Sequence, residues 1–230
     1  MLSPVAAPRS AASFAPAEAR TRTGNWKTWG LGLLLAAVIG GVCQAAPVTL
    51  YDSITGNSVD SSSTADATNW LANQFKTDSD QYTVASVVLQ FASAPLGSIE
   101  VDLYSNNSTL NVPGSSLKTF TNPSLQSGAN TFTMTGSPVL TKDSSYWIVV
   151  KNSGIWQYTA GNATGPGASQ RWADGSNSGG NWNASEGGPY MMTVSAVPVP
   201  EPSTYAMGAA GLAFTGLMAA RRRLARRRAS

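Results

Sequence analysis

The run Ser98-Ile-Glu-Val-Asp-Leu-Tyr104 alternates apolar and polar side chains, and it decides the fold class of this chain. In an extended backbone Ile99, Val101 and Leu103 point to one side, while the two acids and the tyrosine point to the other. Period-two alternation with one polar face is typical of an antiparallel strand that covers a core on one side only. We therefore expect a strand here, with an acidic face toward solvent.

Two further runs have strand periodicity. In the first, alternate residues are expected to form one buried face: Thr83, Ala85, Val87, Leu89 and Phe91. The second, residues 146–150, is apolar on both sides, because Trp147 and Val149 alternate with other apolar residues. A strand buried on both faces lies inside its sheet, so we expect residues 146–150 to be a central strand.

Weaker strand patterns occupy residues 69–76, 130–135, 155–159, 170–173 and 190–196. Clusters of Ser, Asn, Pro, Gly and Asp separate these runs, and such clusters mark turns. Short strands with regular turn signals, and no capped helical periodicity, predict an all-β domain. Over residues 46–196 we expect an antiparallel two-sheet β-sandwich that is jelly-roll-like.

The N-terminal part of the chain differs from this domain. Residues 1–25 are rich in Ala, Pro, Ser and Thr with scattered arginines, and we expect a disordered basic extension. Residues 26–45 contain a basic n-region, an apolar h-region and small residues at a cleavage site. This pattern predicts a helical signal peptide that is cut after Ala45. A lipoprotein alternative would use Cys43, but the preceding Val42 is not small. The long basic start also allows a start codon further downstream.

Charge and cysteine content exclude several functions. Residues 46–200 carry five basic and ten acidic side chains, a formal charge of −5, although the whole chain is +3. The basic excess lies in the two ends, so we do not expect nucleic-acid binding. The sole cysteine, Cys43, lies in the predicted signal peptide, so the exported part would contain no disulfide.

Residues 197–230 form three consecutive parts. Pro198, Pro200 and Pro202 fall within five positions, and such a segment is extended and accessible because proline cannot continue a helix or a strand ladder. The sixteen residues Tyr205–Ala220 carry no charge, which is just short of the minimum of about 17 for a membrane span. We expect a single transmembrane helix that holds the chain in the membrane only transiently.

A basic cluster ends the chain. It contains six arginines within eight positions: Arg221, Arg222, Arg223, Arg226, Arg227 and Arg228. Arginines stay on the cytoplasmic side of a membrane, so the cluster is predicted to stop transfer. The alternatives are an ordinary permanent C-terminal anchor and a surface helix with a basic end.

The motif Pro200-Glu201-Pro202, the apolar segment and the arginine cluster resemble a PEP-CTERM sorting signal. This resemblance implies that an exosortase, a membrane-embedded protease, recognises the motif and passes the protein to the cell surface. It also implies a Gram-negative bacterium that produces extracellular polysaccharide. It says nothing about what the domain before the signal does.

A second resemblance covers most of residues 50–195. Its motifs are Trp70-Leu71-Ala72 with Phe75, Val101-Asp102-Leu103-Tyr104-Ser105, Pro113-Gly114, Thr131-Phe132-Thr133 and Tyr146-Trp147-Ile148-Val149-Val150. These are similar to the choice-of-anchor R domain, a family of exported β domains with varied C-terminal anchors. The resemblance implies a fold and brings no catalytic residues.

The residue types limit the chemistry. The chain has no histidine, which removes the usual base of serine and cysteine hydrolases and the commonest zinc ligand. A glycosidase could still use paired carboxylates, here Glu100, Asp102 or Glu186. The turn around Asp78 and Asp80 could bind calcium, but a solvated turn is the simpler interpretation. We expect no enzyme activity, no cofactor and no metal.

Aromatic residues gather between residues 153 and 183, where Gly-Asn-rich segments at 161–167 and 175–181 predict long loops. The four side chains of interest are Trp156, Tyr158, Trp172 and Trp182. Flat rings beside Asn, Asp and Arg suit a sugar-binding surface. The same rings could instead pack in the core or cover the loops, and both interpretations stay open.

Together with what the PEP-CTERM resemblance implies, these patterns predict an exported, non-enzymatic protein of the cell surface or extracellular matrix, associated with exopolysaccharide and biofilm. Its expected partners are the exosortase, the membrane through the C-terminal helix, and exopolysaccharide. The alternative is a carbohydrate-binding module that uses the four aromatic residues. A secreted glycosidase based on carboxylates is the third hypothesis.

Overall fold

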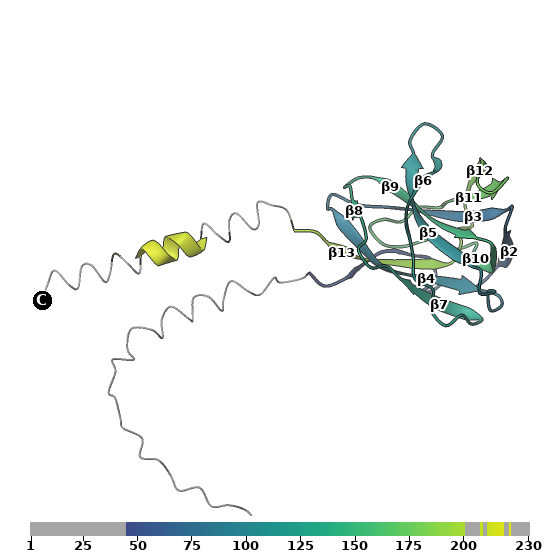
Figure 1. Cartoon of the computed structure of the whole chain (residues 1–230), viewed down its shortest axis with the longest axis horizontal. Coiled ribbons are helices and arrows are strands. Elements are labelled where there is room, and N and C mark those ends of the chain that lie inside the picture. The colour runs from purple at the N-terminus through teal and green to yellow at the C-terminus, as the bar shows by residue number, and fades with distance from the viewer. Residues whose placement is uncertain (1–44, 201–207, 209–210, 219–220, 222–230) are drawn as a thin grey trace, which may run out of the picture. The chain divides into compact units, whose positions relative to one another are not determined.

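The structure, a computed structural model, describes residues 45–200, 208, 211–218 and 221 (Figure 1). The predicted basic extension and nearly all of the predicted signal peptide lie outside these residues. The described residues of the C-terminal segment, 208, 211–218 and 221, are helical. None of the helices within the described ranges combines the length and the apolar character needed to cross a membrane.

Residues 48–198 form a β structure. Its strands are β1 (Val48–Asp52), β2 (Ser61–Asp66), β3 (Trp70–Lys76), β4 (Tyr82–Phe91), β5 (Glu100–Asn107), β6 (Val112–Thr119), β7 (Gly128–Thr133), β8 (Val139–Leu140), β9 (Ser145–Lys151), β10 (Ser153–Tyr158), β11 (Arg171–Ser176), β12 (Asn181–Glu186) and β13 (Met192–Pro198).

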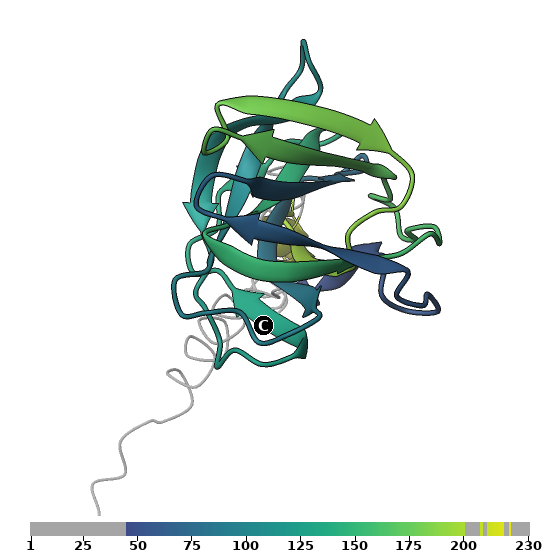
Figure 2. The ribbon, with the colours of Figure 1, turned by 90° about the vertical axis from the view of Figure 1, so that its right-hand side faces the viewer.

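The strands form two antiparallel sheets. One has seven strands in the order β1-β13-β4-β10-β2, with β7 and β8 also paired to β4. The other has six strands in the order β12-β11-β3-β9-β5-β6. Figure 2 shows the β11–β12 hairpin, in light green, continuing the six-stranded sheet beyond β3.

One large apolar core receives side chains from both sheets, as in a β-sandwich. The seven-stranded sheet contributes Leu50, Val87 and Val194, and the six-stranded sheet contributes Phe75 and Ile148, all with 0% exposure. Burial of this apolar surface is the main driving force for folding, because residues 45–200 contain no cysteine and therefore no disulfide. The predicted all-β fold class with two antiparallel sheets is confirmed.

The strongest strand predictions hold. Ile99, Val101 and Leu103 lie in the core, as their alternation indicates. Strand β9 lies between β3 and β5, inside its sheet. Side chains on its two faces belong to two different apolar clusters. Ile148 lies in the core, and Trp147 lies in a smaller cluster on the outer face of the sheet.

Strand β4 departs from the predicted alternation. Its buried residues are Tyr82 and Val84, then Val87, Leu89 and Phe91. The pairing with β13 slips at this point, because Ser195 pairs with Ser86 and the next residue pairs with Val84. Ala85 is thus an extra residue, a β-bulge, and a bulge reverses the side on which the following residues lie. The prediction that Thr83 and Ala85 share the buried face was wrong.

The weaker strand patterns correspond to β3, β7, β10, β11 and β13. The sequence patterns missed β1, β2, β6, β8 and β12. Strand β2 reads Ser-Ser-Ser-Thr-Ala-Asp and β12 reads Asn-Trp-Asn-Ala-Ser-Glu, and both are edge strands that bury little. Of the two predicted long loops, residues 161–167 are a loop, whereas residues 175–181 belong to the β11–β12 hairpin.

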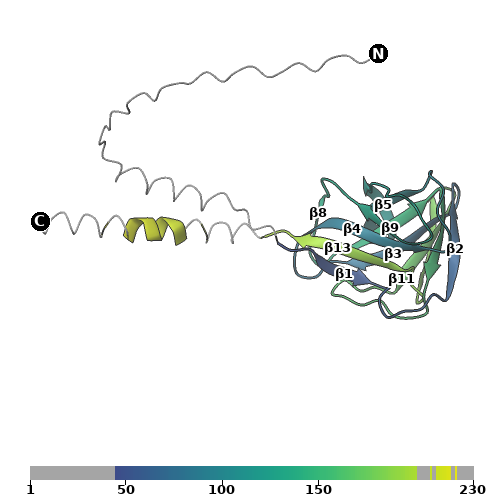
Figure 3. The same cartoon turned by 90° about the horizontal axis from the view of Figure 1, so that it is seen from below.

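The first and last strands lie side by side. Val48 of β1 pairs with Ala196 of β13, so the described domain begins and ends at the same edge of one sheet. Strand β2 lies at the opposite end of the domain from this point (Figure 3). The segment that follows Pro198 therefore leaves the sheets beside the N-terminal end of the domain.

Candidate functional site

Trp156 on β10 is a core residue. It is 0% exposed, and its indole stacks on the ring of Tyr190 with centroids 4.7 Å apart and planes 17° apart. Its Nε1 donates a hydrogen bond to the carbonyl oxygen of Met191 at 3.0 Å. The ring cannot reach a ligand at the surface, so core packing is the interpretation that applies to Trp156.

Two of the other predicted rings meet at a small pocket, called here the Tyr190 pocket. Its volume is about 190 Å³, and it is lined by Ser63, Tyr158, Trp172, Gly187, Gly188 and Tyr190. The rings of Tyr158 and Trp172 stand nearly perpendicular to Tyr190, at centroid distances of 6.2 and 5.9 Å. Since Tyr158 belongs to the seven-stranded sheet and Trp172 to the six-stranded sheet, the pocket lies where the two sheets meet.

Polar groups surround these rings. The Tyr190 hydroxyl donates to Oδ1 of Asp174 at 3.0 Å, and Nε1 of Trp172 donates to the carbonyl oxygen of Gly187 at 2.6 Å. Burial raises the pKa of Tyr190 far above its ordinary value, so its hydroxyl remains a hydrogen-bond donor. Aromatic faces next to fixed polar groups are the elements of a small sugar subsite.

Trp182 lies elsewhere, in a second concavity called the Trp182 groove. This groove has a volume of about 530 Å³ and lies between the β5–β6 and β11–β12 hairpins. The ring of Trp182 packs against Trp70, with centroids 6.5 Å apart. A Cβ added to Gly175 would lie 2.8 Å from the Trp182 ring, and one added to Gly179 would lie 2.5 Å from the Trp70 ring. Both glycines therefore let the indoles lie against the backbone.

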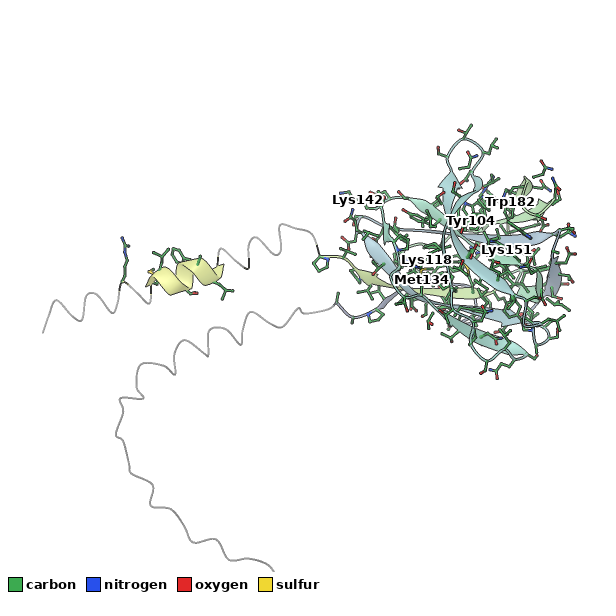
Figure 4. The ribbon with its side chains drawn as sticks, viewed as in Figure 1. Tyr104, Lys118, Met134, Lys142, Lys151 and Trp182 are labelled. Atoms are coloured by element: carbon green, nitrogen blue, oxygen red, sulfur yellow. The ribbon has the colours of Figure 1, made fainter. Side chains whose placement is uncertain are left out.

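The outer face of β5 is not the solvated acidic face that the alternation predicted. Asp102 is 1% exposed and Lys151 is 6% exposed. The Nζ atom of Lys151 lies 2.5 Å from Oδ2 of Asp102 and 2.7 Å from Oε1 of Glu100. Figure 4 labels Lys151, Tyr104 and Trp182 over the same part of the six-stranded sheet. Trp70 of β3 and Tyr104 of β5 lie over Lys151 on this face, and Trp182 of β12 packs against Trp70.

Aromatic rings complete the environment of this lysine. Its Nζ lies 4.7 Å from the centroid of Trp70 and 5.3 Å from that of Tyr104. Burial alone would lower the pKa of Lys151, but hydrogen bonds to Asp102 and Glu100 and the charge of Asp102 outweigh burial and raise it above its ordinary value. We call Glu100, Asp102 and Lys151 the Lys151 cluster.

Two of the three carboxylates proposed for a glycosidase lie together, and the third lies elsewhere. Glu100 and Asp102 both contact Lys151, whereas Glu186 pairs with Arg171 at 3.0 Å on a different hairpin. In the candidate calcium turn, Asp78 accepts a hydrogen bond from the Tyr82 hydroxyl at 3.0 Å and from the backbone N–H of Asp80 at 3.0 Å. Within the described residues no three acidic or thiol side chains gather as a metal site would require.

Sequence patterns missed the residues that organise these sites. Tyr190 links three rings, yet it lies at the start of a weak strand pattern without other signals. Lys151 ends the central strand, and only its pairing opposite Glu100 reveals its partner. Trp70 was part of a motif that indicates the fold, but nothing in the sequence assigned it to a site. Its contact with Trp182 joins segments that are far apart in the sequence.

Few of the predicted sorting residues are described. Pro200 is the last residue of the described domain, two positions after β13 ends. Glu201, Pro202 and the arginines after Arg221 lie outside the described residues. Ala45, the predicted cleavage position, is the first described residue and precedes β1 by three positions.

An all-β domain followed by a proline-rich segment and an apolar, arginine-ended tail is the layout of an exported protein with a C-terminal sorting signal. Residues 198–223 match the family model of the PEP-CTERM protein-sorting motif. The predicted motif is thereby confirmed, and it supports exosortase-dependent sorting of an exported protein to the cell surface of a Gram-negative bacterium. No curated protein matches the chain.

Proposed function

We propose that this chain is a non-enzymatic protein of the cell surface or extracellular matrix, released from its tail by an exosortase at Pro200-Glu201-Pro202. The observation that carries the proposal is the place of the sorting motif, which begins at Pro198 where the last strand ends. Beyond Pro198 the described segment keeps one backbone hydrogen bond, from the N–H of Val199 to the carbonyl oxygen of Gln81 at 2.8 Å. A protease that engages the motif from Pro200 onward therefore need not open either sheet.

In this proposal the membrane is a transient partner. Tyr205–Ala220 holds the exported chain in the inner membrane, and the six arginines from Arg221 to Arg228 keep its end on the cytoplasmic side. After cleavage the domain associates with exopolysaccharide in a biofilm matrix. The absence of histidine from the sequence and the engagement of Glu100, Asp102 and Glu186 in ion pairs support a binding or structural role.

Replacing Pro200 and Pro202 together by alanine tests the sorting step. We expect the double variant to accumulate as an unprocessed precursor in the inner membrane, while the wild-type domain reaches the surface at its mature size. Pro189→Ala, outside the matched motif, is the control and should be processed normally. A double variant with wild-type size and surface location would contradict the proposal.

A second candidate function is carbohydrate binding at the Tyr190 pocket. Its support is the group of three rings with a donor hydroxyl from Ser63 nearby, in a pocket of about 190 Å³ that fits one sugar residue better than an extended chain. Trp172→Ala should reduce binding to the host polysaccharide at least about tenfold if it removes a stacking surface worth about 1.4 kcal/mol. Trp182→Ala, in the separate groove, is the matched control. Equal binding by all three proteins would exclude the pocket.

The finer fold assignment is also a proposal. We infer that the domain is of the choice-of-anchor R type with jelly-roll connections, and that helices flank it in the precursor. Support comes from the motifs quoted for the resemblance, because they fall in β3, β5, β6, β7 and β9, mostly in the six-stranded sheet.

A further inference from the structure

The Lys151 cluster joins two neighbouring strands. Glu100 of β5 pairs directly with Lys151 of β9 in the ladder, and Asp102 lies two residues further along β5 on the same face. As a result Nζ of Lys151 contacts one carboxyl oxygen of each acid, at 2.5 Å for Asp102 and 2.7 Å for Glu100. The amine and both carboxyl groups are thus in contact before any movement of the backbone.

As an ion pair, the Lys151 cluster leaves one buried polar atom without a hydrogen-bond partner in the described part of the chain. The side chains of Lys151 and Asp102 are only 8% and 2% exposed. Oδ1 of Asp102 is buried and has no hydrogen-bond partner among the described residues. A buried carboxylate oxygen without a partner is costly, and an uncharged amide oxygen in the same place costs less. Removing both charges would therefore stabilise this face of the sheet.

We propose that Lys151 and Asp102 condense into an intramolecular amide bond, with Glu100 as the group that carries the protons. The proposal does not depend on the function proposed above. Reacting groups held in contact reach effective concentrations of about 10⁵–10⁸ M. This offsets the fact that free amines and carboxylates do not condense to amides to any extent in water. The rings of Trp70 and Tyr104 beside Nζ keep bulk water away from the reacting atoms.

The reaction needs no external reagent. Glu100 takes one proton from the ammonium group, and the freed lone pair of Nζ attacks Cγ of Asp102 to form the N–C bond. Glu100 returns its proton to the carboxyl oxygen that leaves, and a second proton from Nζ completes a water molecule as the C–O bond breaks. The product is an uncharged amide plus one water, and Glu100 is unchanged. Its side chain is 41% exposed, so protons and the released water have a route to solvent.

Such a bond would tie β5 to β9 at the centre of the six-stranded sheet. A covalent cross-link stabilises a fold mainly by restricting the unfolded chain, as a disulfide does. The only cysteine of this chain precedes the described domain, so the amide would supply a link that is independent of redox conditions.

Peptide mapping of the full chain tests the proposal. Trypsin cuts after lysine and arginine, so an unlinked chain yields residues 77–118 and residues 143–151 as separate peptides. With the amide bond, Lys151 is no longer cut, and residues 77–118 are recovered joined to residues 143–171 with a mass lower by one water. The digest is made on denatured protein, so the result does not depend on any variant folding. Separate peptides and a free Lys151 would overturn the proposal.

Three variants assign the roles. Asp102→Ala should abolish the joined peptide, and persistence of the same mass loss would contradict the assignment. Glu100→Gln should slow formation of the link about 100-fold in a time course that starts from newly synthesised, unlinked chain, the usual size of a general acid–base effect. An unchanged rate would remove Glu100 from the mechanism. Lys142→Arg, which changes a lysine outside the cluster, should leave the joined peptide unchanged, because trypsin also cuts after arginine.

Discussion

The indole of Trp156 lies flat on the ring of Tyr190, with the two planes only 17° apart. Tyr190 also makes edge-on contacts with Tyr158 and Trp172, and these three residues line the Tyr190 pocket, whereas Trp156 does not. Tyr190 therefore belongs both to the core and to the candidate sugar subsite. A change in the core should reach the pocket through this residue.

Trp156→Ala should destabilise the domain by about 3–5 kcal/mol, since it removes a large, fully buried side chain and leaves a cavity. Chemical denaturation of the purified protein measures the effect. Trp172→Ala, at a partly buried ring, should cost clearly less. If Trp156→Ala left the free energy of unfolding unchanged, the buried position of this ring would be wrong.

Gly175→Ala should displace the Trp182 ring, because the new Cβ would lie 2.8 Å from it. Overpacking of this kind costs about 1–3 kcal/mol. Gly97→Ala is the matched control, since a Cβ at Gly97 meets no atom within 4 Å. Thermal unfolding and tryptophan fluorescence of the two variants should differ, and identical curves would argue against the contact between Trp182 and the β11–β12 backbone.

Tyr51 should make the domain sensitive to alkali. Burial raises the pKa of the Tyr51 hydroxyl to about 12. The hydrogen bond that Asn73 donates to this hydroxyl acts in the opposite direction, but burial has the larger effect. Because the pKa of Tyr51 is higher in the folded than in the unfolded protein, its neutral hydroxyl contributes fully to stability below pH 10. This contribution is lost as the pH rises toward and through the pKa of the folded protein. The loss is about 1.4 kcal/mol per pH unit between pH 10 and 12.

The difference in tyrosinate absorbance between wild type and Tyr51→Phe isolates this titration. We expect the variant to lose less stability than wild type over the same pH interval. Parallel losses in the two proteins would show that Tyr51 ionises as it does in the unfolded chain.

Asp66 should hold the turn between β2 and β3 in a manner that depends on pH. Its carboxylate accepts hydrogen bonds from the Thr68 hydroxyl and from the backbone N–H groups of Asn69 and Thr68, which lower its pKa below the ordinary value of 3.8. The stabilisation is therefore present above pH 3.8 and is lost as the pH falls through the lower folded value.

Amide chemical shifts of Thr68 and Asn69 during an acid titration report this turn. In Asp66→Asn the side-chain oxygen still accepts these bonds but does not titrate, so the shifts should stay constant. A wild-type turn that loosens already above pH 4.5 would contradict the lowered pKa.

Local sequence determined the strand character and the sorting signal. The alternation of Ile99, Val101 and Leu103 placed them on the core side, because side-chain direction in a strand follows from the backbone alone. The two-sided apolar pattern of residues 146–150 likewise identified a central strand. The motif from Pro198 to Arg223 could be found from the sequence, since a sorting enzyme must recognise a linear segment.

The tertiary structure alone decided which residues share a site. Asp102 alternates like a solvent-facing acid, yet the pairing of β5 with β9 buries it against Lys151. Ala85 looks like any strand residue, and only the slip against β13 makes it a bulge. Trp156 and Trp172 have similar sequence surroundings, but one lies in the core and the other at a pocket. The physical reason is that burial and pairing depend on partners distant in the sequence, and no period within a single strand encodes them.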